Sequence, residues 1–462
     1  MSLPTREEVL VRGAWVLTSA TVGEVRDGAV LIADGTIAAV GSYADLRRAH
    51  PAITVVGDGT GVVIPGLVNA HTHLSEALIP GMGSDLTLFE WGTRVVTPAG
   101  TVLTREMARE GSLLKAAELL HSGVTCVNDM FHHYHAGSFA SLGVVEGLTE
   151  VGLRGMVAFG AEDAFEVFGG RRFTVEEAME EHLALEEATA GAELLEFRMG
   201  VGTMLGSTDM LLEAAIGTAS ERSWPVHTHL AEVREEVVEA RSRWGRNSVE
   251  QAAAIGLLDL EVIAAHLIWL SEGDVELLVA HRTAGAHNPI ANMILGSGVS
   301  CVPRLRAAGL RLGLGTDGAA SNDSQNMLEV MKMAALLQKV HRLDPASLTA
   351  SEVLRMATIG GAEALGVADR IGSLEPGKRA DVVLLGGTAE LANIHDPYQQ
   401  IAYCISPRSV SDVWVDGRRL LAAGVPTTVD EAEQIARCRP LAETLVRESG
   451  LVAEGMSRLC EM

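Results

Sequence analysis

The sequence predicts an α/β fold in which a (β/α)8 TIM barrel carries a small β-sandwich formed by both chain ends. In the middle of the chain, short apolar runs with strand character alternate with amphipathic helical segments. Eight such units favour a closed barrel over an open sheet. Short β-type runs separated by turn signals also occur near each end of the chain. The 462 residues can bury a large core and form more than one domain.

The two chain ends contain matching β-type segments. The first has runs at 9–12, 28–32 and 36–40, divided by Asp27-Gly28 and Asp34-Gly35. It is too short to be stable alone, and similar runs return at 380–385 and 411–418. We therefore expect a sandwich made of residues 1–64 and 371–425, with the barrel inserted as residues 65–370 and a helical segment at 426–462.

The barrel is predicted to begin with the apolar run that leads from Gly61 to His73. A helix is expected from Thr104 to Ser122, where Gly123 provides a stop signal. Helical patterns also cover 210–222 and 248–258. The seven further strand-like runs are 124–130, 154–160, 197–202, 225–232, 261–267, 283–289 and 311–317.

Composition and charge restrict the class of protein. A formal net charge of −24 argues against nucleic acid or an anionic membrane as a partner. The five cysteines are scattered without a C-x-x-C pair, so neither a disulfide framework nor a cysteine–zinc site is indicated. No apolar leader and no membrane-spanning stretch is recognisable. We expect a cytoplasmic enzyme with a small-molecule substrate.

Titratable side chains gather at the predicted strand ends. His71 and His73 are two residues apart on one strand, so they face the same side, and neutral imidazole is a favoured zinc ligand. The carboxyl ends of barrel strands meet at one mouth. Later strands end in further histidines and acidic residues: His227, His229 and Glu232; His266; His287; and Asp317. Three histidines and an aspartate would form a metal site with room for water, and spacing alone leaves His227 and His229 as competing ligands.

Several stretches resemble the amidohydrolase superfamily, in the branch of aminohydrolases that act on aminated heterocycles. They are 65–73, 229–232, 287–298 (HNPIANMILGSG), 315–322 (GTDGAASN), 331–339 and 372–381 (GSLEPGKRAD). The local likeness is greatest to the methylthioadenosine/S-adenosylhomocysteine deaminases, and triazine hydrolases are related. The resemblance covers nearly the whole chain and implies a deaminase that releases ammonia from a purine-like ring.

The resemblance also implies roles for individual residues. One divalent metal, zinc by default with iron or manganese as alternatives, would be bound by His71, His73, His229 and Asp317. The motif H-L-x-E selects His229 as the ligand and leaves His227 as a packed core histidine, with a role beside the ligands as the alternative.

The same resemblance implies the catalytic residues. Asp317 would take a proton from water, and Glu232 would protonate a ring nitrogen and then the departing ammonia. His266 would contact the water or the reacting group and stabilise charge there. Trp91 either stacks on the substrate or holds its loop onto the barrel. His132, His133 and His135 are expected to line the pocket or to lie in a surface loop rather than bind a second metal.

Two departures from the nucleoside deaminases concern the sugar. Residues 96–100 offer no carboxylate, and residues 202–207 offer no histidine, where those relatives contact ribose. We therefore expect a more apolar pocket. In addition, the family motif S-N-x-K is Ala291-Asn292-Met293-Ile294 here.

The ring and the leaving group stay open at this stage. Displacement of chloride or alkylamine from an s-triazine, or cyclic amide hydrolysis, is the alternative. A non-catalytic barrel is disfavoured because every metal ligand of the family is present. Family habit adds the expectation of a homo-oligomer.

Overall fold

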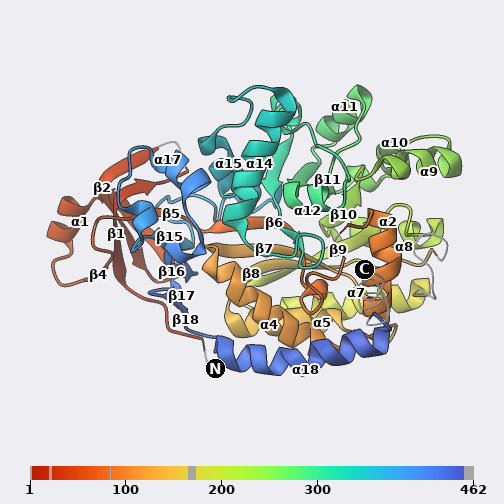
Figure 1. The fold of residues 1–462 in the computed structure, drawn as a ribbon, viewed down its shortest axis with the longest axis horizontal. Coiled ribbons are helices and arrows are strands. Elements are labelled where there is room, and N and C mark those ends of the chain that lie inside the picture. Colours follow the sequence, from red (N-terminus) through yellow and green to blue (C-terminus); the bar gives the residue numbers. More distant parts are fainter. Residues whose placement is uncertain (1–2, 20–22, 84, 165–172, 452–462) are drawn as a thin grey trace, which may run out of the picture.

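The computed structural model describes residues 3–19, 23–83, 85–164 and 173–451, and it contains a closed parallel barrel with a mixed sheet beside it (Figure 1). Each barrel strand pairs in parallel with the next along the chain, and the last pairs back with the first through Leu314 and Asn69. The predicted TIM barrel is therefore confirmed. Its strands are β6 (Leu67–His73), β7 (Val124–Phe131), β8 (Arg154–Phe159), β9 (Leu195–Thr203), β10 (Val226–Leu230), β11 (Val262–His266), β12 (Ala284–His287) and β13 (Arg311–Leu314).

A short additional strand, β14 (Asp317–Gly318), follows β13 and pairs with the end of β6, Asp317 opposite Thr72. This pairing brings the predicted acidic ligand next to the predicted histidine pair. Every residue of β6, β7, β8, β10, β11 and β12 is buried, as expected of strands covered on both faces.

Helices cover the barrel, and local capping explains where several of them begin. The expected helices correspond to α4 (Arg105–His121), α8 (Asp209–Arg222) and α10 (Ser248–Ala254). The side chains of Thr104, Thr208 and Asn247 each accept a hydrogen bond from the first turn of the helix that follows. The other barrel helices are α2 (Leu88–Trp91), α3 (Thr97–Val102), α5 (Ser141–Val151), α7 (Val175–Ala190), α9 (Arg234–Trp244), α11 (Glu272–Ala280), α12 (Pro289–Ile294), α13 (Val302–Ala307), α14 (Met327–Arg342), α15 (Ala350–Met356) and α16 (Ile359–Ala364).

The two chain ends meet in one continuous mixed sheet, which is the form that the expected sandwich takes. Its strand order is β18-β17-β16-β15-β5-β1-β2-β3, and β4 also pairs with β1. The junction is the antiparallel pairing of β5 with β15, Ile64 opposite Val383. The strands are β1 (Val9–Leu17), β2 (Glu24–Ala33), β3 (Thr36–Ser42), β4 (Thr54–Val56), β5 (Val62–Pro65), β15 (Val382–Leu385), β16 (Val410–Val415), β17 (Arg418–Ala422) and β18 (Val425–Pro426). Helices α1 (Tyr43–Ala49) and α17 (Pro397–Gln399) belong to the same end of the molecule (Figure 1).

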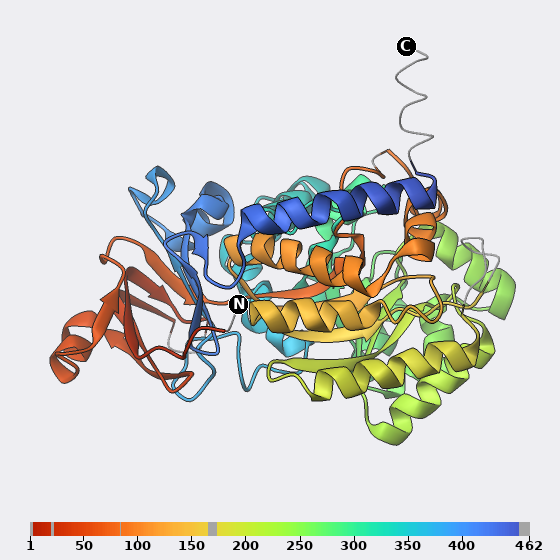
Figure 2. The same ribbon diagram turned by 90° about the horizontal axis from the view of Figure 1, so that it is seen from below.

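The last described helix, α18 (Glu431–Ser449), crosses back from the sheet and lies along α4 of the barrel (Figure 2). The Gln434 side chain donates a hydrogen bond of 2.8 Å to the Glu110 carbonyl, and Cys438 packs against the same turn. No helix in the described ranges is long and apolar enough to cross a membrane.

A buried ion pair joins the sheet to the barrel. Arg154, at the start of β8, donates to both carboxylate oxygens of Asp381 at 2.9 and 3.1 Å. Asp381 also accepts the backbone N–H of Asp416 at 2.9 Å, and the Asp416 carboxylate in turn contacts Arg6 and Arg379. Arg154 and Asp381 are 9% and 3% exposed, so neither charge is solvated if its partner is lost.

We expect Asp381→Asn to lower the free energy of unfolding by up to about 3–5 kcal/mol, because it leaves the buried Arg154 guanidinium with only the Asp416 carboxylate, 3.5 Å away, as a counter-charge. Urea denaturation followed by circular dichroism measures this change. Asp45→Asn is the matched control, because its pair with Arg48 is exposed and is expected to matter by less than about 1 kcal/mol. Equal effects of the two substitutions would contradict a structural role for the buried pair.

Candidate active site

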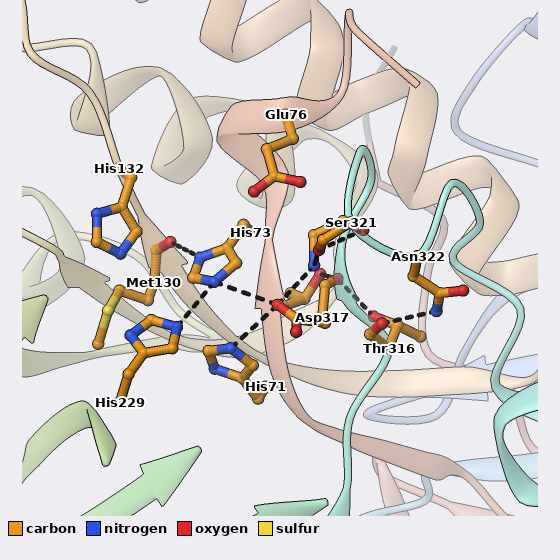
Figure 3. A network of polar contacts seen from close by, with 12 residues as sticks. His71, His73, Glu76, Met130, His132, His229, Thr316, Asp317, Ser321 and Asn322 are labelled. Atoms are coloured by element: carbon orange, nitrogen blue, oxygen red, sulfur yellow. Dashed lines mark hydrogen bonds and ion pairs between the residues drawn. The ribbon is translucent and has the colours of Figure 1, made fainter. Parts of the chain in front are cut away.

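The predicted ligands converge at the carboxyl-terminal mouth of the barrel (Figure 3). His71 and His73 come from β6, His229 from β10, and Asp317 from β14. His73 Nε2 lies 3.1 Å from His229 Nε2 and 3.3 Å from Asp317 Oδ1, which is also 3.3 Å from His71 Nε2. The structure thus brings together four side chains, the first and last of which, His71 and Asp317, are more than 240 positions apart in the sequence.

The outer nitrogen of each of these histidines has a hydrogen-bond partner. His73 Nδ1 donates to the Met130 carbonyl at 2.6 Å, and His229 Nδ1 donates to the Gly202 carbonyl at 2.8 Å. His71 Nδ1 is hydrogen-bonded to His227 Nε2 at 2.8 Å. These bonds fix the ring orientations and direct the three Nε2 atoms toward one another, as is usual for metal-binding histidines.

Burial sets the charge of these groups. It lowers the pKa of His73 to about 3 and the pKa of His229 well below its ordinary value, so both rings are neutral at pH 7. Burial acts to raise the pKa of Asp317, but His71 and His266 nearby outweigh it, and that pKa lies below its usual range. Neutral imidazole and ionised carboxylate are the forms that bind metal.

The donor set fits a divalent metal ion. A tetrahedral ion with bonds of about 2.0–2.1 Å keeps its ligand atoms about 3.3 Å apart. The measured separations of 3.1–3.3 Å agree with this spacing. In addition, His71 Nε2 is buried, and its one hydrogen-bond or ion-pair contact among the described residues is with Asp317 Oδ1 at 3.3 Å.

Two further titratable groups stand beside this cluster. Burial raises the pKa of Glu232 to about 7, so it exchanges a proton near neutral pH. His266 Nδ1 donates to Asn292 Oδ1 at 2.8 Å, and its Nε2 lies 3.6 Å from Glu232 Oε2 and 3.7 Å from Asp317 Oδ2. Burial acts to lower the pKa of His266, but these two carboxylates outweigh burial and raise it.

A cavity of about 70 Å³ lies next to these groups. Trp91 lines it, and the indole N–H of Trp91 donates to the Ala320 carbonyl at 3.0 Å. Trp91 therefore contacts the pocket and also fixes its loop against the segment after β14, so both expected roles are compatible with its position. The lining residues are His73, Glu76, Leu88, Trp91, Gly92, Val96, His132, Tyr134, Glu162, Thr203, His229 and Glu232.

Three polar lining residues, Glu76, Tyr134 and Glu162, are not among the site residues predicted from the sequence. Glu76 is buried three positions after His73 and accepts the Ala320 N–H at 2.8 Å. Glu162 and Tyr134 follow the ends of β8 and β7 and are hydrogen-bonded to each other. Their position after strand ends was the available signal. The expected apolar pocket is therefore lined in part by polar side chains from other strands.

The three clustered histidines have different environments. His132 lines the cavity, with its ring centroid 5.0 Å from that of His73 and 5.6 Å from that of His229. His133 is fully buried and bonded to Glu181 at 2.7 Å, and His135 donates to the Leu103 carbonyl at 3.1 Å. Of the three, His132 is the one that lines this cavity. His227 is fully buried, as expected of a packed histidine, and it also contacts His71.

The chain is similar to proteins of known activity. The family model described as Amidohydrolase family matches residues 62–420, and one for an imidazolonepropionase-like composite domain of bacteria matches 28–52. A 5-methylthioadenosine/S-adenosylhomocysteine deaminase of Desulforudis audaxviator is 36% identical over 439 residues, 93% of this chain and 98% of that protein. A 5′-deoxyadenosine deaminase of Methanopyrus kandleri is 34% identical over 425 residues, 91% and 96% of the two chains.

Two solved structures have the same fold over almost their full lengths. An adenosine deaminase from Xanthomonas campestris with bound zinc aligns with a TM-score of 0.86 at 29% identity, covering 96% of this chain and 99% of that one. An atrazine chlorohydrolase from Arthrobacter aurescens complexed with zinc aligns with a TM-score of 0.85 at 25% identity, covering 94% and 100%.

We expect His227→Leu to weaken metal binding about 10- to 100-fold, because it leaves the outer nitrogen of His71 without its partner. Competition with a chromophoric chelator measures this affinity. His182→Leu is the matched control: His182 is also fully buried, but it packs between Phe159 and Phe197. An equal loss in both variants would show that the effect comes from general destabilisation.

Proposed function

The chain belongs to the amidohydrolase family, and on this basis we propose that it is a metal-dependent aminohydrolase that releases ammonia from an aminated purine-type ring. It is a hydrolase acting on C–N bonds. The observation that carries the proposal is the pair Glu232 and His266 next to the converging metal-binding groups. A carboxyl group with a pKa of about 7 can donate a proton to a ring nitrogen, which deamination requires.

We assign His71, His73, His229 and Asp317 as the ligands of one divalent ion. The separations of their donor atoms and the neutral state of the imidazoles support this assignment. Zinc is the proposed ion, because nitrogen–oxygen ligation suits it and two structurally similar proteins are described with zinc. When bound, such an ion acts as a Lewis acid that makes hydroxide accessible near neutral pH.

The protein side chains then transfer protons and stabilise the charge that develops on the substrate. Asp317 Oδ2, which faces His266, takes a proton from the attacking water. Glu232 donates a proton to the ring nitrogen beside the reacting carbon. It then receives the proton that Asp317 took from the water and delivers it to the departing ammonia, and the hydroxyl proton released as the carbonyl forms restores Glu232. His266 is held by Asn292 through Nδ1, so its protonated Nε2 is aimed at the site where negative charge develops on the attacking oxygen. Burial of all three groups excludes competing solvent.

The proposal also covers the kind of substrate, the cellular location and the oligomeric state. The small cavity beside the site supports a small-molecule substrate, and the net charge of −24 argues against nucleic acid. The four cysteines among the described residues are all free, which supports a reducing cytoplasm. A homo-oligomer is proposed from family habit alone.

We expect the zinc-loaded protein to release ammonia from one class in a panel of adenosine-type nucleosides, free purines, pterins and s-triazines. Glu232→Gln is expected to lower kcat about 10²- to 10⁴-fold, because it removes the proton donor, and Asp317→Asn is expected to abolish activity. Glu187→Gln, at an exposed position of α7, is the control. A coupled ammonia assay gives the rates.

Release of chloride or alkylamine without ammonia would contradict deamination. It would favour the displacement chemistry named by the atrazine chlorohydrolase that shares the fold.

We also expect chelation to abolish activity and zinc to restore it, with about one ion bound per chain, because the possible donor groups among the described residues overlap around His71, His73 and His229. Elemental analysis of the reloaded protein gives the number. A value near two ions per chain would contradict the proposal of a single ion. It would point to the second donor group formed by His132 together with His73 and His229.

A further inference from the structure

A second carboxylate besides Glu232 lies close to the reacting groups. Glu162, on the loop after β8, is 1% exposed and lines the cavity. A Cβ placed on Gly202 would lie 2.8 Å from Glu162 Cγ and 3.1 Å from His132 Cε1. The carbonyl of the same Gly202 accepts the Nδ1–H of His229. Glu162 and His132 therefore stand together beside the metal-binding cluster.

Glycines provide the space that these two side chains occupy. A Cβ on Gly206 would lie 2.0 Å from Glu162 Oε1, and one on Gly160 would lie 2.4 Å from His132 Cε1. Real Cβ atoms do not approach other atoms this closely, so any larger residue at these positions would displace the pocket side chains. The backbone at the ends of β8 and β9 is thus built around Glu162 and His132.

Hydrogen bonds fix the Glu162 carboxylate in one orientation. Thr203 donates to Oε1 at 2.8 Å, and the Tyr134 hydroxyl donates to Oε2 at 3.1 Å. The supporting loop is held by the N–H groups of Asp163 and Ala164, which both donate to the Gly206 carbonyl. A carboxylate that is positioned before the substrate enters loses little entropy on binding.

Acidic side chains contribute much of the polar lining of the cavity. The described lining contains Glu76, Glu162 and Glu232 and no lysine or arginine, and burial raises the pKa of Glu76 and of Glu232, so these two carry less negative charge than free carboxylates. An ionised carboxylate accepts hydrogen bonds and donates none. Such a wall favours neutral or cationic ligands with N–H or O–H groups and disfavours phosphorylated or carboxylated ones.

From these observations we propose that Glu162 is a specificity-determining residue, which accepts hydrogen bonds from donor groups on the part of the substrate away from the reacting carbon. The donors are ring N–H groups or sugar hydroxyls, which share this chemistry. The proposal rests on the proposed deaminase function and adds the selection of neutral, donor-bearing substrates over anionic ones.

Two ligand pairs test the proposal, each differing in its donors. Adenosine is compared with 2′,3′-dideoxyadenosine for the sugar hydroxyls, and adenine with 9-methyladenine for the ring N–H. Deamination kinetics and quenching of tryptophan fluorescence, to which Trp91 at the cavity contributes, give kcat/KM and Kd. We expect wild type to prefer the donor-bearing member of one pair by about 10- to 100-fold, and Glu162→Gln to reduce that preference to about threefold or less.

Charge selection provides an independent readout. Wild type is expected to bind adenosine 5′-monophosphate much more weakly than adenosine. Glu162→Gln is expected to reduce the ratio of the two Kd values, because the substitution removes one negative charge. Glu187→Gln, at an exposed position of α7, serves as the matched control outside the cavity. Tyr134→Phe, which removes one positioning bond while keeping the carboxylate, is expected to change the preference by a smaller factor in the same direction.

The possible outcomes separate the two proposals. Donor-dependent binding without ammonia release would support Glu162 and contradict deamination. Ammonia release with equal effects of Glu162→Gln on all four ligands, or with no effect, would overturn the role of Glu162 and leave deamination intact. A Glu162→Gln protein that does not fold is replaced by Tyr134→Phe, for which an unchanged preference would also overturn the proposal. Absence of any binding would contradict both.

Discussion

The structure depends on the burial of three neutral imidazoles and an ionised aspartate at one barrel mouth. Such a group of polar atoms is costly in a protein interior unless each atom has a partner. The outer nitrogens are satisfied by the Met130 and Gly202 carbonyls and by His227, while the inner nitrogens of His71 and His73 face the Asp317 carboxylate. The proposed cation at the centre would contact these inner atoms together. This arrangement is held by the strand ends, by the added strand β14 and by the surrounding carbonyls.

Much of the fold and of the central site could be predicted because both follow from short periodic patterns. Two histidines at i and i+2 must share one side of a strand, and a barrel must bring its strand ends together. His71, His73, His229 and Asp317 converge for this reason. His227 was harder to interpret, because spacing shows that it faces the same side as His229 but not that its ring reaches His71.

The pocket wall was not predictable to the same degree. Beyond a strand end, side chains no longer alternate in a fixed way, so the sequence could not show that His132 faces the cavity while His133 turns toward Glu181. Glu76 and Glu162 read as ordinary acidic residues in loops. Their burial depends on close approaches to Gly318 and Gly206, which are contacts between segments distant in the chain. Substrate recognition therefore lies mostly outside what local patterns reveal.

The pairing of β5 with both β1 and β15 has a consequence for biosynthesis. Strand β5 leads directly into β6, so the outer sheet and the strand that carries His71 and His73 are one continuous segment. During translation, one edge of β5 stays unpaired until the whole barrel has emerged and β15 follows it. An open strand edge invites intermolecular pairing. The nascent chain thus carries an aggregation-prone edge for most of its synthesis. This edge of β5 is protected only by β15, a strand that is made after the whole barrel.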